Sequence, residues 1–310
     1  MTTKRWHGGE LRWNSDSQEW SVLASGRAPR PHVLTRTECP FCPGPGEDTP
    51  AETWRLAGVD GGWRVRAVRN RYALSDGHEV VIESPSHDWD PATATTSEVV
   101  DVLSAWQARH LALRVDAAQV AVFRSHGRAA GISLSHPHSQ VAGLPVLSSA
   151  TRRELEIARD HHSTYRRSLA RDILASELNI GTRIVFADDE VIAFSPFAPR
   201  ADCEVRFTLR KPDADFAAAP RSGVEAVARC LRAVLSALRT AFGDPAYNLV
   251  LRTAPSGYED APFLAWSLQL LPRFDIAAGL ELATGIPVVT VSPDQAAARL
   301  RTRVAAAVTP

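Results

Sequence analysis

The sequence predicts an α+β protein with mostly antiparallel sheets, built from two halves of similar element order. Three observations lead to this prediction. Short β-branched runs alternate in hydropathy as strands do, long amphipathic helical stretches separate them, and the order of these elements recurs after about residue 150. We therefore expect one half over residues 1–150 and a related half over residues 151–310.

The first half begins with a segment that has little periodicity. Residues 1–62 are rich in Gly, Pro, Trp and Arg and predict loops with short strands. Ser97 can cap a helix that runs to about Arg114 and presents an apolar face. The strands predicted for this half are Trp63–Arg69, His78–Glu83, Gln119–Arg124 and Ser135–Val141.

The second half repeats this order between two further helices. A helical stretch from about Ser149 to Leu178, ended by Gly181, opens it. Ser292-Pro293-Asp294 opens the last helix, with Ser as the cap and Pro in the first turn. Between them the sequence predicts, in order, strands at Thr182–Ala187, Val191–Ser195 and Cys203–Leu209, a helix at Gly223–Phe242, and strands at Tyr247–Arg252 and Trp266–Leu271.

The overall composition excludes several classes of protein. The chain has 35 Lys and Arg against 35 Asp and Glu, so its net charge gives no sign of the basic face that nucleic acid requires. Its apolar share of 45% suffices for a sizeable core, yet no run approaches the length of a membrane span. The N-terminus shows no secretory signal, and four cysteines do not make a disulfide scaffold. We expect a cytoplasmic protein with reduced thiols.

The sharpest motif is Ser135-His136-Pro137-His138-Ser139-Gln140. Side chains alternate between the faces of a strand, so His136, His138 and Gln140 are expected on one face. Pro137 stiffens the link between the histidines and is unusual within a strand. The loop before the motif contains Gly127 and Gly131, and its backbone N–H groups can approach an anion. A pair of partly exposed strand histidines is the plainer alternative.

The second motif is Cys39-Pro40-Phe41-Cys42, followed by Gly44 and Gly46. A Cys-x-x-Cys is either a redox pair or half of a zinc site. The Pro- and Gly-rich surroundings favour a knuckle-like turn over a helix N-terminus, and hence favour zinc. Because the chain has no second Cys-x-x-Cys, the remaining ligands must come from elsewhere, and His87 and His136 are natural candidates.

Together these two motifs resemble the galactose-1-phosphate uridylyltransferase family of the histidine-triad superfamily. The resemblance implies two tandem histidine-triad-like halves, each a mostly antiparallel sheet with helices. Only the first half is expected to be catalytic, because the equivalent strand of the second, Trp266–Leu271, has no His-x-His. Further segments that resemble the family are Gly26–Pro31, Asn70–Leu74, Gly77–His87, Gly127–Ser133, Tyr247–Leu251, Leu271–Arg273 and Gly279–Glu281.

The resemblance also implies a role for each residue of the site. One structural zinc ion would be bound by Cys39, Cys42, His87 and His136. His138 would be the nucleophile that attacks the α-phosphorus of a nucleoside diphosphate sugar, and Gln140 would bind the phosphoryl oxygens. The remaining roles would be phosphate binding by Ser133, Arg27 and Arg30, contact with the base by Asn70, and contact with the sugar hydroxyls by Glu281.

The sequence departs from the family at several positions. Family members often hold a second metal ion with one glutamate and three histidines. Glu154 matches the glutamate, but Arg252, Ser267 and Gln269 stand at the histidine positions, so we predict that this second site is absent. Ile132 and Leu280 also differ from the residues common at substrate-facing positions, which puts galactose in doubt more than nucleotidyl transfer.

The function expected from the sequence is nucleotidyl transfer, by default of UMP, between a nucleoside diphosphate sugar and a sugar 1-phosphate. A homodimer is consistent with the family. One alternative is a nucleoside diphosphate sugar phosphorylase that transfers an adenylyl or guanylyl group to inorganic phosphate. The other is a zinc-stabilised nucleotide-binding protein without turnover, against which the intact His138 and Gln140 argue.

Overall fold

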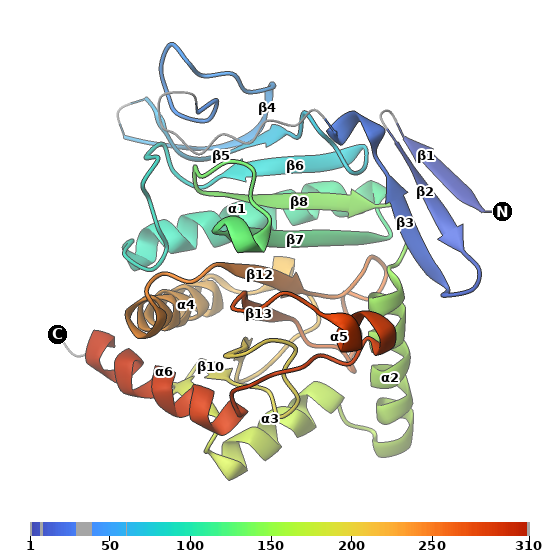
Figure 1. Cartoon of the computed structure of the whole chain (residues 1–310), viewed down its shortest axis with the longest axis vertical. Helices are drawn as coiled ribbons and strands as arrows, with labels where there is room; N and C mark the ends of the chain where they lie inside the picture. The colour runs from blue at the N-terminus through green and yellow to red at the C-terminus, as the bar shows by residue number, and fades with distance from the viewer. Residues whose placement is uncertain (1, 7–8, 29–38, 60, 309–310) are drawn as a thin grey trace.

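A single long antiparallel sheet forms the centre of the molecule (Figure 1). The computed structural model describes residues 2–6, 9–28, 39–59 and 61–308, with side chains to residue 305. Within these residues the sheet has ten strands in the order β4-β5-β6-β8-β7-β12-β13-β11-β10-β9. From one end of the sheet inward the order is β4-β5-β6-β8-β7, and from the other end it is β9-β10-β11-β13-β12, so the two halves repeat one pattern. A long helix also occupies the same place in each half, since α1 lies between β6 and β7 in sequence and α4 between β11 and β12. The predicted α+β fold with two similar halves is therefore confirmed.

The first half of the chain supplies one end of the sheet and a separate three-stranded sheet near the N-terminus. The small sheet consists of β1 (Thr3–Trp6), β2 (Gly9–Asn14) and β3 (Glu19–Leu23). The elements of the large sheet in this half are β4 (Glu52–Ala57), β5 (Trp63–Arg69), β6 (Gly77–Ile82), helix α1 (Thr96–Leu113), β7 (Gln119–His126) and β8 (His138–Leu144).

The second half supplies the other end. Its strands join those of the first half where β12 pairs with β7, with Tyr247 opposite His126. The predicted division near residue 150 falls close to the start of α2 and stays a prediction. The elements of this half are α2 (Ser149–Tyr165), α3 (Leu169–Ile180), β9 (Ile184–Ala187), β10 (Val191–Phe194), β11 (Val205–Leu209), α4 (Arg221–Phe242), β12 (Tyr247–Arg252), β13 (Ser267–Pro272), α5 (Gly279–Thr284) and α6 (Pro293–Val308).

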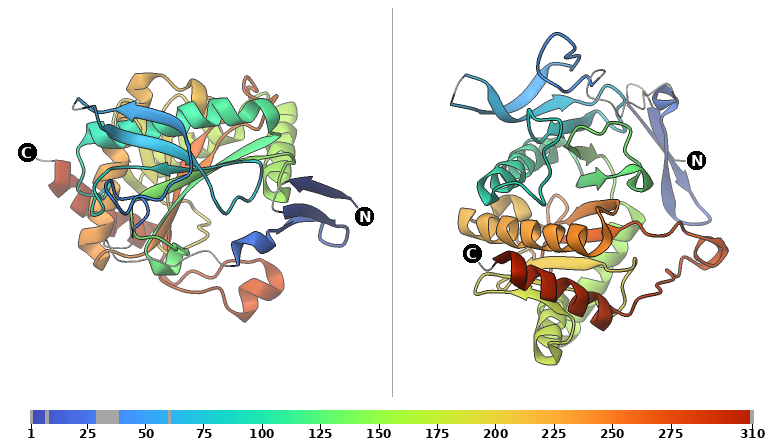
Figure 2. Two further views of the ribbon diagram at one scale, coloured as in Figure 1. Left: turned by 90° about the horizontal axis from the view of Figure 1, so that it is seen from above. Right: turned by 60° about the vertical axis from the view of Figure 1, so that its left-hand side comes forward.

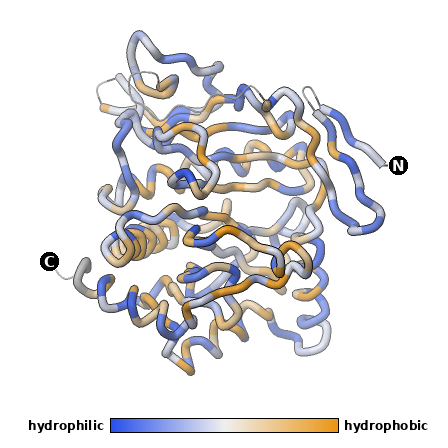
Figure 3. The backbone as a smooth tube through the Cα atoms, viewed as in Figure 1, coloured by the Kyte–Doolittle hydropathy of each residue, from blue (hydrophilic) through white to orange (hydrophobic). Residues whose placement is uncertain are grey.

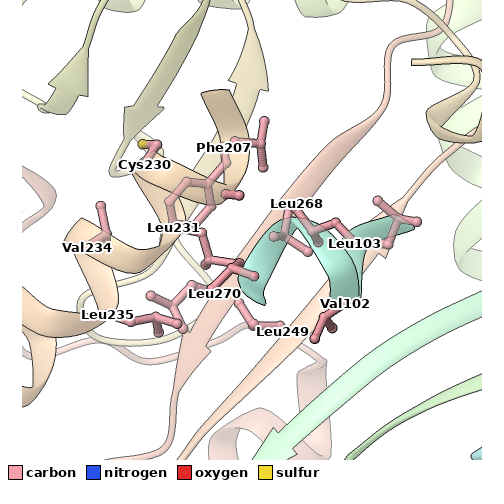
Figure 4. Packing of buried hydrophobic residues seen from close by; sticks show 14 of the residues in the cluster. Val102, Leu103, Phe207, Cys230, Leu231, Val234, Leu235, Leu249, Leu268 and Leu270 are labelled. Atoms are coloured by element: carbon pink, nitrogen blue, oxygen red, sulfur yellow. The ribbon is translucent and has the colours of Figure 1, made fainter. Parts of the chain in front are cut away.

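The hydrophobic core lies between the sheet and the helices α1 and α4. Leu103 of α1, Leu235 of α4 and Leu268 of β13 are almost fully buried in one cluster (Figure 4). Hydrophobic colours follow α4 in Figure 3, in agreement with the buried face of this helix. Figure 2 shows α1 on one side of the sheet and the segment around α5 on the other. The face that α1 leaves uncovered is therefore available for polar side chains from the strands.

Several predicted boundaries differ from the structure, and three of the differences have a local reason. The cap of α1 is Thr95 rather than Ser97, because Thr95 and Glu98 form a reciprocal capping box. The helical stretch after Ser149 is two helices, since Arg166 adopts a left-handed conformation (φ 56°) and ends α2, whereas Gly181 ends α3 as predicted. Strand β8 begins at His138 rather than Ser135, because Pro137 has no N–H to donate to a neighbouring strand.

His110 near the end of α1 is a buried titratable group with no role in a site. It is 2% exposed, and among the described residues neither of its ring nitrogens has a hydrogen-bond partner. Burial lowers the pKa of His110 to about 4, below the value of about 6.5 expected in the unfolded chain. The unfolded chain therefore takes up a proton that the folded protein resists, so stability from this residue is complete above about pH 6.5 and is lost as the pH falls toward 4.

Replacing His110 with Phe should therefore flatten the pH dependence of stability. Between pH 8 and pH 5 the free energy of unfolding should fall by about 2 kcal/mol less in the variant than in the wild type. Urea unfolding at both pH values measures this difference. Equal losses in the two proteins would show that His110 titrates normally in the fold.

In the described part of the chain, every helix is too short or too polar to cross a lipid bilayer. This agrees with the absence of a long apolar run in the sequence.

Candidate functional site

Two cysteines and two histidines converge beside the first residues of strand β8. Cys39 and Cys42 lie in the turn before β4, His87 follows β6, and His136 precedes β8. One ligand atom from each of the four residues lies within 4.8 Å of all the others. Cys42 Sγ is 3.3 Å from His87 Nδ1 and 3.5 Å from His136 Nδ1. The four residues predicted to bind a metal ion are thus brought together.

Hydrogen bonds on the far side of each imidazole orient these histidines. His136 Nε2 lies 2.8 Å from the carbonyl oxygen of Ser84 and must donate to it, so the lone pair of the neutral ring is on Nδ1, facing Cys42. His87 Nε2 lies 3.0 Å from Ser135 Oγ, which likewise leaves Nδ1 toward the sulfur. Burial lowers the pKa of His136 to about 4, so the ring stays neutral at pH 7. Two oriented imidazoles and two thiol groups fit a metal ion.

The turn that carries the cysteines also contacts the candidate nucleophile. Phe41 packs against Val80 and Ile82 of the sheet. Its ring meets those of His136 and His138 edge-on, with centroids 6.0 Å and 5.7 Å apart. Metal binding at the turn would therefore be communicated to His138 by direct packing as well as through the backbone.

His138 points away from the helices because of its place on β8. Its neighbour Ser139 faces α1, where Ser139 Oγ accepts a 2.6 Å hydrogen bond from Trp106 Nε1. Because side chains alternate along a strand, His138 and Gln140 face the opposite side. His138 Nδ1 donates to the carbonyl oxygen of His136 at 2.8 Å, so the lone pair of the neutral ring is on Nε2. Burial lowers the pKa of His138, which favours the neutral form.

A pocket opens on this face of the sheet, and we call it the His138 pocket. It contains five of the residues predicted to bind substrate or act in catalysis. Arg27 donates a hydrogen bond to the carbonyl oxygen of Tyr72 at its rim. Arg30, also predicted to bind phosphate, lies outside the described residues. The residues that line the pocket include Arg27, Asn70, Tyr72, Ser125, Ser133, His138 and Gln140.

The loop between β7 and β8 has the tight backbone expected of a phosphate loop. Gly127 and Gly131 have φ angles of +76° and +84°, which favour glycine. A Cβ atom at Gly127 would lie 2.7 Å from the Cβ of Ala246, so a larger residue would push the loop off the second half. Ser133 at the end of this loop lines the His138 pocket, and its predicted role in phosphate binding stays a prediction.

Glu281 lies apart from the other predicted residues. It is in the short helix α5 and lines a different pocket with Arg252 and Arg273. Its carboxylate accepts the N–H of Ala278 at 3.0 Å and so caps its own helix. Within one chain the structure does not bring Glu281 to the His138 pocket.

Arg252 lies between Gln269 and Glu154, which stand at two of the positions where the family resemblance would place ligands of a second metal ion. Arg252 Nε is 3.3 Å from Gln269 Oε1 and 4.0 Å from Glu154 Oε1. The guanidinium group of Arg252 therefore places positive charge beside Glu154. The absence of a second metal ion stays a prediction.

Residues from the second half brace the His138 pocket, and none of them had a predicted role. Asn248 Nδ2 donates to Ser125 Oγ at 2.8 Å and to the carbonyl oxygen of Ala130 at 3.1 Å. Arg273 Nε donates to Asn248 Oδ1 at 2.6 Å. Ser125 lines the pocket, so its own hydroxyl proton can point into it. Both runs were predicted as strands, but not that they would pair and bring Ser125 next to Asn248.

His78 is a further residue without a predicted role, and it contacts Gln140 directly. His78 Nε2 is 3.0 Å from Gln140 Oε1. A signal was available: alternation along the predicted strand puts His78 on the same face as Val80, and Val80 pairs with Gln140. The sequence did not show that this strand pairs with the strand of Gln140, so the contact between His78 and Gln140 could not be predicted from the alternation.

Comparison with known proteins bears on the strands that carry these residues. The family model described as galactose-1-phosphate uridyl transferase, N-terminal domain, matches residues 76–147. This segment includes β6, β7 and β8 with His136, His138 and Gln140. The resemblance to the galactose-1-phosphate uridylyltransferase family is confirmed.

Two relatives match almost the whole chain. A galactose-1-phosphate uridylyltransferase from Thermotoga maritima is 22% identical over 94% of this chain and 98% of its own. An ADP-glucose phosphorylase from Arabidopsis thaliana is 24% identical over 94% of this chain and 92% of its own. A solved uridylyltransferase structure, 24% identical, superimposes with a TM-score of 0.81 over 96% of this chain and 99% of that one. The galactose-1-phosphate uridylyltransferase resemblance therefore extends through both halves of the sheet.

Proposed function

We propose that this protein is a nucleotidyltransferase that works through a covalent nucleotidyl group on His138. The observation that carries the proposal is the 2.8 Å hydrogen bond from His138 Nδ1 to the carbonyl oxygen of His136. It assigns the free lone pair to Nε2, the nitrogen needed to attack phosphorus. Gln140 and Ser133 line the same pocket and offer donors to phosphoryl oxygens.

The reaction proceeds in two balanced steps. In the first, His138 Nε2 forms a bond to the α-phosphorus of a nucleoside diphosphate sugar, and the bond from that phosphorus to the bridging oxygen breaks. The electron pair leaves with the sugar 1-phosphate, which needs no proton. The ring is then cationic, and the carbonyl of His136 stabilises its Nδ1–H. In the second step a phosphate oxygen of the acceptor attacks the phosphorus, the N–P bond breaks and the neutral ring returns.

The remaining residues of the proposed site bind the substrates. Arg27 and Arg30 clamp the phosphates of the sugar phosphate, a task that suits the planar guanidinium group. Asn70 lies near the nucleoside, and Glu281 of the partner subunit in a homodimer lies near the sugar hydroxyls. The catalytic residues belong to the first half, residues 1–150, and the second half, residues 151–310, supports them.

The metal ion held by Cys39, Cys42, His87 and His136 is proposed to be zinc. Four protein ligands complete a tetrahedral shell and leave no position for a substrate, so the ion would be structural. Its role here is to fix His136, whose carbonyl oxygen orients the nucleophile. The same ligand types also accept iron or cobalt, which metal analysis distinguishes.

Two candidate reactions fit this site, and they differ in the nucleotide donor and in the phosphate acceptor. By default the donor is a UDP-sugar and the acceptor a sugar 1-phosphate. The second candidate is a phosphorylase that transfers an adenylyl or guanylyl group to inorganic phosphate. The Arabidopsis relative, an ADP-glucose phosphorylase that matches 94% of this chain, favours this candidate. Both reactions share the His138 intermediate.

Intact-protein mass spectrometry tests the proposal. The protein is incubated briefly with UDP-, ADP- or GDP-sugars without an acceptor and quenched at alkaline pH, where phosphohistidine bonds survive. A gain of one nucleoside monophosphate is expected, and the base that gives it identifies the donor. A chase with a sugar 1-phosphate or with inorganic phosphate then shows which acceptor removes the group. Nucleotide binding without an adduct from any donor would instead indicate a binding protein without turnover.

A homodimer is part of the proposal, and exposed apolar side chains around α5 support it. Ile276 is 91% exposed and Leu282 is 79% exposed, which is costly for a surface left in water. A partner subunit covering this segment would also give Glu281 a route to a sugar in the opposite pocket. Light scattering should give twice the chain mass of 33.7 kDa, and Leu282→Glu should lower that mass. A wild type that elutes as single chains would rule this out.

A further inference from the structure

His78 is buried beside Gln140 with a defined partner for each ring nitrogen. The side chain lies on β6 and is only 2% exposed. Its Nδ1 accepts the backbone N–H of Leu74 at 2.9 Å. Its Nε2 lies 3.0 Å from Gln140 Oε1 and 3.2 Å from Asn70 Nδ2, and of these two atoms only the Gln140 oxygen can accept a hydrogen bond. His78 therefore links the loop before β6 to β8, the strand that carries the proposed nucleophile. Strands β6 and β8 lie side by side in Figure 1.

The partner of Nδ1 determines which nitrogen of His78 carries the proton. A backbone N–H can only donate, so Nδ1 holds a lone pair and the proton of a neutral ring is on Nε2. Burial lowers the pKa of His78 to about 4, so the ring is neutral at pH 7. The Nε2–H group then donates to Gln140 Oε1.

This hydrogen bond fixes which end of the Gln140 amide faces the pocket. The carbonyl oxygen of Gln140 receives His78 Nε2–H and lies 3.4 Å from Asn70 Nδ2, which also donates. With its oxygen held by two donors, the amide presents its NH₂ group to the His138 pocket. The reverse orientation would put a carbonyl oxygen against phosphoryl oxygens and repel them.

We propose that His78 is a positioning residue that locks the Gln140 amide with its NH₂ group toward the α-phosphoryl oxygens. The inference rests on the proposed nucleotidyl transfer and adds a residue to it. An amide can rotate to exchange its oxygen and nitrogen with little change in shape, so a site that needs a donor must hold it in place. Preorganised donors favour the charge that develops on the phosphoryl oxygens as the N–P bond forms.

The alternative is that His78 only supports the loop through Leu74. The same loop carries Asn70 and Tyr72, which line the pocket, so a disordered loop would also slow the reaction. The two explanations differ in whether the effect of His78 depends on Gln140. A double-mutant cycle measures this dependence directly.

The experiment compares the single-turnover rate of nucleotidyl–enzyme formation in wild type, His78→Phe, Gln140→Ala and the double variant. The donor is the sugar nucleotide that gives the adduct in the wild type. His78→Phe should slow the step about tenfold, the loss of one oriented hydrogen bond, with little change in donor affinity. In the Gln140→Ala background the same substitution should change the rate less than about twofold. His78→Gln, whose amide nitrogen can replace Nε2, should recover most of the rate.

His110→Phe is the matched control. It also replaces a histidine that is 2% exposed with phenylalanine, but at a position away from the pocket. It should leave the rate unchanged, and all variants should keep their metal content. Equal slowing by His78→Phe with and without Gln140 would overturn the inference and leave the proposed function intact. A wild type that forms no adduct would overturn the proposed function and this inference together.

Discussion

The variant His138→Gly is expected to form no nucleotidyl–enzyme and to lose activity by about 10⁴-fold or more, because a double displacement has no first step without its nucleophile. The side chain lies in the pocket with Nδ1 committed to the carbonyl oxygen of His136. Among the residues that the structure describes, His138 is the one histidine that lines that pocket. The mass assay should therefore show an unmodified chain with every donor.

The fold should survive this change, which makes the result interpretable. His138 is only partly buried, and the strand keeps its pairing with Ile82 of β6. Donor binding, measured by calorimetry, should persist because Gln140 and Arg27 remain. The matched control is His126→Gly on the adjacent strand β7, whose side chain stacks on Tyr247. It should form the adduct normally, and an adduct on His138→Gly would move the nucleophile to another residue.

The parts of the site that could be predicted from the sequence are those with short, specific spacing. A Cys-x-x-Cys turn and a His-x-His strand restrict the ligand types and made His87 and His136 candidates, and the family resemblance then named Cys39, Cys42, His87 and His136 together. The structure brings them within 4.8 Å. Two runs of elements in the same order likewise indicated the repeated strand order of the sheet.

The parts that could not be predicted depend on contacts between distant segments. The bond between Asn248 and Ser125 joins residues 123 positions apart, and it exists because β7 and β12 are neighbours. The orientation of Gln140 depends on the proton of His78, which in turn depends on the N–H of Leu74. Spacing along one segment carries no information on such pairs.

Some local failures have a different cause. The break between α2 and α3 at Arg166 follows no Gly or Pro, and a residue that can continue a helix gives no stop signal. Glu281 was placed by resemblance, which does not say whether a residue acts in its own chain or in a partner. Its position in a separate pocket raises that question only once the fold is known.

The second large effect is expected from removal of the metal ion, through Cys42→Ser. Cys42 Sγ lies 3.3 Å and 3.5 Å from the two histidine nitrogens, and a serine hydroxyl is a much poorer ligand than a thiolate. Metal analysis should fall from one ion per chain to none. Loss of a tightly bound ion should cost about 4 kcal/mol of stability, or roughly 6 °C in Tm for a chain of this length.

Activity should fall together with stability, even though the ion touches no substrate. Without it the ring of His136 loses its anchor on the cysteine turn, and His136 supplies the carbonyl oxygen that orients His138. Phe41, which contacts both rings, is released by the same change. The rate of adduct formation should therefore drop in the variant below its melting temperature.

The control variant Cys203→Ser distinguishes the effect of losing the metal ion from the cost of placing a serine hydroxyl where a thiol was buried. Cys203 is buried, whereas Cys42 is partly buried, so the control includes at least the full cost of a buried hydroxyl. Cys203 lies outside the metal group, and the variant should keep one ion per chain. A wild type with two ions per chain would contradict the predicted absence of the second family site at Glu154, Arg252, Ser267 and Gln269. If Cys42→Ser lost the ion but kept its Tm and rate, the ion would not be structural, and the orientation of His138 would have to come from the strand alone.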